Sequence, residues 1–285
     1  DTPVAVLSSH YRPVSHYFRQ NFSQVTNPPI DSLRENKVMS LKTRFGNLGN
    51  ILDFDNLTEE NIYVLDSPIL TNSQFKKFKK FFSKKVKIID CTFDIKSSLK
   101  NRIEAIREES ETAVREGSSC LILSDKNISN QKASIPSILT VGAVHSYLVK
   151  QGLRGYCSLN VECSDALDTH SFAVLIGVGA TIVNPYLAID SIYQRFEKKL
   201  FSNSDFESCI AKFKKSIDDG LLKIMSKMGI SVISSYRGGC NFEAVGLSRA
   251  IASDYFPGMS SRISGIGIGG IEKKIKEHHQ NFISN

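Results

Sequence analysis

Apolar residues along this chain fall either in short continuous runs or in longer segments where they recur at helical spacing. The short runs are typical of buried strands, and the spaced segments are typical of amphipathic helices. Because the two alternate, the pattern predicts a parallel sheet with right-handed crossovers, either open and doubly wound or closed into a barrel. The predicted strands cover 62–65, 86–91, 120–124, 156–161, 180–183 and 231–235.

The predicted helices between these strands begin and end at residues that favour helix ends. Pro136 suits the first turn of a helix that runs to about Lys150. Gly117 and Gly152 suit the positions just after two helices, and Asp168 suits the cap of a short one. These boundaries support the alternation that the hydrophobic pattern predicts.

The N-terminal part of the chain departs from this alternation. The segment 15–25 is predicted to be a helix, and the sequence TNPP at 26–29 is predicted to be a stiff turn, since proline restricts itself and the residue before it. Asp31 can cap a short helix that runs to about Met39, and a segment rich in hydroxyls and cations follows at 40–47. One interpretation is an arm packed on the core, and the other is a segment that holds its shape for a ligand.

Composition limits the class of protein. A chain of 285 residues with 41% hydrophobic and 23% charged residues can bury a large core, and no apolar run approaches the roughly 20 residues of a membrane span. The chain begins at Asp1 without methionine, and we expect it to be a piece of a longer polypeptide. No C-x-x-C pair is present, which favours reduced thiols over a zinc site or disulfide scaffold. The cysteines are Cys91, Cys120, Cys157, Cys163, Cys209 and Cys240.

The net charge of +7 includes a basic block at 76–87. Such a block is compatible with nucleic-acid binding. Phenylalanines recur within and beside it at helical spacing, however, which is typical of an amphipathic helix with a lysine-rich solvent face. We favour the helix and expect neither nucleic acid nor a membrane as a partner.

Ligands of parallel α/β folds gather at the carboxyl ends of strands, and here those ends are polar without pairing a nucleophile with a base. The best candidate is Arg237 with Gly238 and Gly239, which could bind a phosphate or carboxylate or could brace a neighbouring domain. His170, beside Asp168, is more typical of a structural histidine. We predict no catalytic residue and no metal ligand.

The glycine-rich segment 265–270 matches the spacing of a dinucleotide-binding fingerprint. It follows no convincing predicted strand, and no acidic residue lies at the required offset of about 20 residues. We therefore predict a flexible connector.

Several motifs in a fixed order closely resemble the central domain of the glutamate synthase large (alpha) subunit, a family that includes the ferredoxin-dependent enzyme. They include QVTNPPIDSLRE at 24–35, VMSLKTRFGNLGN at 38–50, IPSILTVGAVHSYL at 135–148, SFAVLIGVGATIVNPYLA at 171–188 and FPGMSSRISGIG at 256–267. The chain departs from the family at Gly239 and Cys240, where Ala-Gln is usual, and at Ser171, where a second histidine is common.

The resemblance implies a degenerate (β/α) barrel-like single α/β domain with parallel strands and an N-terminal helical arm. We expect the arm and connector at 1–61, the core at 62–255, and a linker toward the FMN-binding synthase domain at 256–285. It also implies that an amidotransferase domain of the same polypeptide releases ammonia from glutamine. The ammonia would pass through a tunnel to the synthase domain, which converts 2-oxoglutarate to glutamate.

FMN and an iron–sulfur cluster are then expected in the synthase domain, with none in this domain. Electrons would come from NAD(P)H through a reductase subunit, or from ferredoxin, in the cytoplasm or a plastid. This domain would be non-catalytic and would contribute part of the tunnel wall. The alternative is an autonomous flavin- or phosphate-binding α/β barrel enzyme. The candidate tunnel residues are Thr26, Asn27, Met39, Ser40, Lys42 and Thr43.

Overall fold

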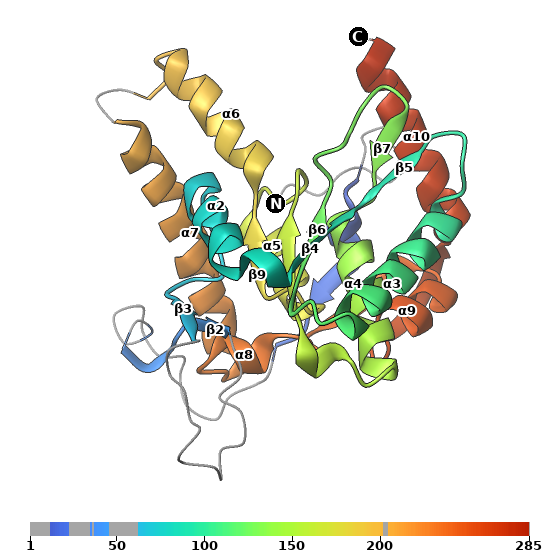
Figure 1. The fold of residues 1–285 in the computed structure, drawn as a ribbon, viewed down its shortest axis with the longest axis horizontal. Coiled ribbons are helices and arrows are strands. Elements are labelled where there is room, and N and C mark those ends of the chain that lie inside the picture. The colour runs from blue at the N-terminus through green and yellow to red at the C-terminus, as the bar shows by residue number, and fades with distance from the viewer. Residues whose placement is uncertain (1–11, 23–34, 36, 46–61, 202–204, 285) are drawn as a thin grey trace.

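The computed structural model describes residues 12–22, 35, 37–45, 62–201 and 205–284 of the chain. At its centre lies a parallel sheet whose strands are adjacent in the order β4, β6, β8, β9 (Figure 1). Ile69 forms a parallel bridge with Val183, so a short segment extends the sheet beyond β9. The strand bounds are β4 Val86–Asp90, β6 Cys120–Ser124, β8 Ser158–Glu162 and β9 Ile182–Asn184.

Helices cover both faces of this sheet. Every residue of β6 is buried, as expected for a strand between two helical layers. Leu121 and Leu123 pack in the main core with residues of α3, α4 and α5, whereas Cys120 and Ile122 pack in a second cluster with phenylalanines of α2. The helix bounds are α2 Asn72–Phe82, α3 Leu99–Arg115, α4 Ser137–Lys150 and α5 Thr169–Gly177.

The predicted α/β, barrel-like class is confirmed. Among the described residues no strand pairing joins β4 to the segment at Ile69, so the sheet does not close into a barrel. An antiparallel pair of strands, β5 (Thr92–Asp94) and β7 (Lys132–Ser134), extends from the ends of β4 and β6 and was not predicted.

A second sheet joins distant parts of the chain. Its central strand β10 (Phe242–Leu247) pairs antiparallel with β1 (Phe18–Gln20) and parallel with β11 (Ser260–Ile266). The helical prediction for 15–25 is therefore wrong at Phe18–Gln20, because pairing with β10 outweighs the local apolar spacing. Within 12–22, the described part of this region, the helical residues are those of Val14–Tyr17, which form a short 3₁₀ turn, η1, before the strand.

The prediction of a flexible connector at 265–270 is also wrong. Gly265 lies in β11, and Gly269 and Gly270 lie in the first turn of α10 (Ile268–Ser284). A side chain at Gly265 would place its Cβ 2.2 Å from the carbonyl oxygen of Gly246. Glycine is therefore needed here for the close approach of two strands rather than for flexibility.

Two further strand predictions are corrected by the structure. The predicted strand at 62–65 exists as β3 (Tyr63–Leu65), but it pairs antiparallel with β2 (Thr43–Phe45) outside the parallel sheet. The predicted strand at 231–235 is instead largely the short helix α8 (Ile233–Tyr236), preceded by a single bridge between Ser40 and Val232.

The remaining helices complete the fold. Helix α7 (Phe206–Met228) begins at the cap Asp205, whose side chain accepts a hydrogen bond from Ser208 N, and ends at Gly229 with φ +70°. It lies beside α6 in Figure 1. No helix in the described ranges is both long and apolar enough to cross a membrane. The other bounds are α6 Tyr186–Glu197, α9 Arg249–Tyr255, η4 Ser83–Lys85 and η5 Arg154–Tyr156.

Candidate functional site

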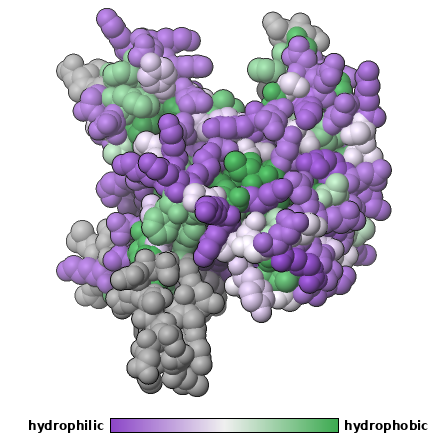
Figure 2. Space-filling view, viewed as in Figure 1, coloured by the Kyte–Doolittle hydropathy of each residue, from purple (hydrophilic) through white to green (hydrophobic). Residues whose placement is uncertain are grey.

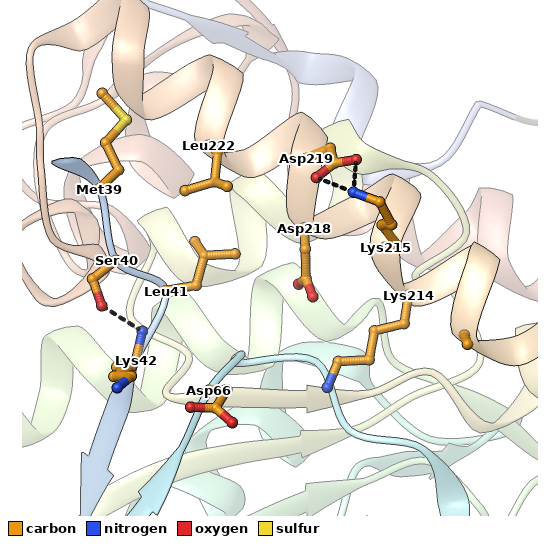
Figure 3. Close-up of a pocket in the computed structure, with 11 residues that line it drawn as sticks. Met39, Ser40, Leu41, Lys42, Asp66, Lys214, Lys215, Asp218, Asp219 and Leu222 are labelled. Atoms are coloured by element: carbon orange, nitrogen blue, oxygen red, sulfur yellow. Dashed lines mark hydrogen bonds and ion pairs between the residues drawn. The ribbon is translucent and has the colours of Figure 1, made fainter. Parts of the chain in front are cut away.

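A pocket of about 450 Å³ lies between the segment before β2 and the polar face of α7 (Figure 3). Segment 39–42 forms one wall, α7 forms the opposite wall, and Asp66 stands at the end of β3. In Figure 3, Leu41 and Leu222 face each other across the pocket. Its lining residues are Met39, Ser40, Leu41, Lys42, Asp66, Ala211, Lys214, Lys215, Asp218, Asp219 and Leu222.

Main-chain hydrogen bonds fix the first wall. The amide of Ser40 donates to Ser231 O (2.8 Å), and the amide of Ile233 donates to Ser40 O (3.0 Å). The side chain of Ser40 accepts a hydrogen bond from Lys42 N (3.2 Å), after which the chain enters β2. Leu41 is buried between these anchors. The wall therefore holds its backbone position independently of any ligand.

Asp218 is the most constrained polar side chain of the second wall. The hydroxyl of buried Ser67 donates to Asp218 Oδ1 (2.7 Å) and accepts a hydrogen bond from Ile69 N (3.0 Å). Burial raises the pKa of Asp218 above its ordinary value, and the hydrogen bond from Ser67 opposes this effect only in part. Asp219 instead forms an exposed ion pair with Lys215 (2.8 Å).

The charges of the pocket are mixed. Lysine and aspartate side chains both line it, and its lining includes no histidine and no cysteine. In the described ranges, no group of three or more His, Cys, Asp or Glu side chains is placed to hold a metal ion. The pocket can therefore surround a small polar molecule, but its lining offers neither a paired nucleophile and base nor a metal centre.

The sequence profile of the family described as "Glutamate synthase central domain" matches residues 1–248. The chain belongs to the glutamate synthase central-domain family. It is 56% identical over 282 residues to the "Glutamate synthase [NADPH] large chain" of Azospirillum brasilense, covering 98% of this chain and 18% of that protein. It is 37% identical over 300 residues to the "Ferredoxin-dependent glutamate synthase" of Pyropia yezoensis, covering 100% of this chain and 19% of that protein.

This central domain thus spans less than a fifth of the length of these relatives. Among solved structures, a flavocytochrome b2 variant with pyruvate bound is similar over 61% of this chain and 39% of that chain. The TM-score is 0.39 and the identity is 16%. A similarity of that size supports no functional argument.

The structure brings together part of the predicted set of tunnel residues. Met39, Ser40 and Lys42 line the pocket. Thr43 does not, because it is buried in β2, where its hydroxyl donates to Leu41 O (3.3 Å). Thr26 and Asn27 lie outside the described residues. Asp66 and the α7 residues were not predicted as their partners, because a polar helix face alone does not show which segment it meets.

Arg237 lies away from this pocket. It follows α8 rather than a strand, and its guanidinium donates from Nε to Ala180 O (3.1 Å) and from Nη2 to Thr181 O (3.4 Å). Burial, with the nearby charge of Arg154, lowers the pKa of Arg237 to about 10. Gly238 has φ +68°, a left-handed conformation that favours glycine. Arg237 thus braces the start of β9, and anion binding by Arg237, Gly238 and Gly239 stays a prediction.

His170, which was singled out from the sequence, and His145 both make structural contacts. His170 Nε2 lies 3.0 Å from Ser15 O, while Asp168 caps α5 by accepting a hydrogen bond from Ser171 N. His145 Nδ1 accepts a hydrogen bond from Arg154 Nε (3.0 Å). Burial, and then the charge of Arg154, lower the pKa of His145 to about 4, so it is neutral at pH 7.

A charge network at the carboxyl edge of the sheet was missed. Glu162, at the end of β8, accepts a hydrogen bond from Ser124 Oγ (2.7 Å) and pairs with Lys79 (3.3 Å) and Lys126 (3.0 Å). Burial alone would raise the pKa of Glu162, but these hydrogen bonds and charges hold it below its ordinary value. The parallel register that places Ser124 opposite Glu162 could have revealed the contact.

Proposed function

We propose that this central domain forms part of the wall of an ammonia passage in a glutamate synthase large chain and is not itself catalytic. The amidotransferase and FMN-binding synthase domains of the same polypeptide would supply the two reactions, glutamine hydrolysis and reductive glutamate formation. FMN and the iron–sulfur cluster would lie in the synthase domain, toward which 256–285 would lead. NAD(P)H through a reductase subunit, or ferredoxin, would supply the electrons.

The observation that carries the proposal is the fixed backbone of segment 39–42 at the pocket wall. A passage that widened would let bulk water reach the ammonia. Water would protonate ammonia and remove the lone pair that attacks a carbonyl, so the passage must keep its width while ammonia moves. Hydrogen bonds from and to Ser40 anchor this segment to the α7–α8 connection. The described lining provides no catalytic pair, which fits a wall better than an active site.

The test is a bulky substitution at Ser40 in the full-length enzyme. Ser40 is half-buried at the pocket, so Ser40→Trp should fill part of the passage. We expect glutamine hydrolysis to continue while the glutamate formed per glutamine hydrolysed falls. Ser40→Ala tests loss of the hydroxyl alone, and Ser253→Trp on the exposed face of α9 is the matched bulky control. An unchanged ratio in Ser40→Trp would count against the passage.

The choice of Ser40 follows from the structure. Thr43 is only 1% exposed, so a large side chain there would disrupt the core and could not separate a blocked passage from misfolding. A flavin absorption band in the purified chain would instead support the alternative of an autonomous flavin-binding barrel.

A further inference from the structure

A lysine-rich surface covers the outer side of α2 and the start of β4. We call it the lysine face, and it comprises Lys76, Lys77, Lys80, Lys84, Lys85 and Lys87, all exposed. No aspartate or glutamate occurs between 71 and 89. Among the described residues, none of these lysines forms an ion pair, whereas neighbouring Lys79 turns inward to Glu162.

The buried side of α2 explains why these lysines point outward. Phe75 and Phe78 are buried in the second core cluster, so Lys76, Lys77 and Lys80 occupy the opposite side of the helix. Lys76 and Lys80 are four residues apart on the helix and repel each other. The lysine face therefore holds concentrated positive charge, and in the described part of the chain no acidic side chain forms an ion pair with its six lysines.

Two large apolar side chains of the same segments are exposed, one on α2 and one on β4. Phe81 is 51% exposed and Ile88 is 52% exposed. Figure 2 shows hydrophobic surface near the middle of this view, flanked by hydrophilic side chains, in the region where β4 and β6 lie in Figure 1. Apolar side chains surrounded by charge are typical of a contact surface with a buried centre and a polar rim.

Strand β4 adds an unpaired edge to this surface. In the described structure it pairs with β6 on one side only, and no strand pairs with its other side. Lysines beside an edge strand repel basic strands and disfavour pairing with neutral ones, because pairing would bury their charge. The same lysines attract an acidic segment, so they would select one class of partner while excluding others.

We propose that an acidic segment of another domain of the large chain docks on the lysine face. Charge complementarity selects the sign of the partner, and Phe81 and Ile88 provide the apolar contact. We place the acidic segment in another domain because this chain covers only about 18% of the length of a large-chain relative, and the rest of such a polypeptide lies outside this domain. Nucleic acid is a poorer fit, because 71–89 contains no arginine for bidentate phosphate contacts. The inference needs only family membership and is independent of the ammonia passage.

The test measures amine reactivity in the full-length large chain. Acetylation rates of Lys76, Lys80 and Lys84 would be compared with those of exposed Lys198 and Lys223 elsewhere on the domain. Docking should slow the first group at least about fivefold relative to the second, because an interface excludes reagent. Equal rates in the two groups would overturn the proposal.

Zero-length carbodiimide cross-linking of the same protein identifies the partner. We expect links from the lysine face to aspartate or glutamate in another domain of the same polypeptide, and loss of those links in the Lys76→Glu/Lys80→Glu/Lys84→Glu variant. Links mainly to a second polypeptide, or slow acetylation that appears only after duplex DNA is added, would contradict the proposed source. Lys198→Glu/Lys223→Glu is the matched charge-reversal control and should leave the links unchanged.

Discussion

Asp218 and Asp219 are adjacent in α7 but lie in different environments, so replacing each gives a matched pair of experiments. Asp218 accepts the hydrogen bond of Ser67, whose side chain is buried, and Asp219 forms an exposed pair with Lys215. Asp218→Ala would leave the Ser67 hydroxyl without its acceptor, which should lower the free energy of unfolding by about 1–3 kcal/mol. Asp219→Asn should lower it by at most about 0.5 kcal/mol.

Asp218→Asn should behave differently because an amide oxygen can still accept from Ser67. Burial raises the pKa of Asp218 from its ordinary 3.8, so the folded protein binds this proton more tightly than the unfolded chain does. The stability of the parent protein therefore falls as pH rises from about 3.8 through the raised pKa. The amide introduced by Asp218→Asn cannot ionise, so the variant lacks this fall, and its stability relative to the parent should improve across that range.

The assay is urea unfolding at pH 4 and pH 7.5, followed by far-ultraviolet circular dichroism because the chain contains no tryptophan. Equal m-values among the variants would show that stability alone has changed. The reasoning fails if Asp218→Ala costs no more than Asp219→Asn. It also fails if the difference between Asp218→Asn and the parent protein does not change with pH.

Two further predictions concern burial. Phe78 is fully buried, whereas Phe81 on the same helix is half exposed. Phe78→Ala should therefore lower the free energy of unfolding by about 3–5 kcal/mol, and Phe81→Ala should lower it by less than about 1 kcal/mol. Equal losses in urea unfolding would refute the packing of α2. In thiol labelling of the folded chain, exposed Cys240 should react fastest and buried Cys120, whose pKa burial raises to about 12, should react only after unfolding. Rapid labelling of Cys120 would show that the sheet opens readily.

The elements that the sequence predicted correctly are those with strong local determinants. β6 was predicted at its observed bounds because its apolar residues are consecutive, and α2 was predicted because its phenylalanines recur at helical spacing. β1 was missed because its strand form depends on β10, more than 200 residues away. Residue 232 was misassigned because its one bridge, to Ser40, does not continue into a strand.

In the candidate site too, the residues with local determinants were predicted and those that depend on tertiary packing were not. Met39, Ser40 and Lys42 could be singled out because a polar segment beside a proline turn is unusual in its own right. Asp218 could not, because nothing in a solvent-facing helix pattern identifies the residue that meets Ser67. Asp66 could not, because nothing in the sequence around β3 shows that it meets α7. Local chemistry therefore identified one wall of the pocket, and only the tertiary packing of α7 supplied the other.

The sheet formed by β1, β10 and β11 has a mechanical consequence. Strands from near the two ends of the chain flank one central strand, so they stand about 10 Å apart, which is twice the usual strand spacing. A force applied to either flank would reach the other through a few backbone hydrogen bonds, without crossing the large parallel core. Neighbouring parts of a longer polypeptide would thus be held at a set distance by this small sheet.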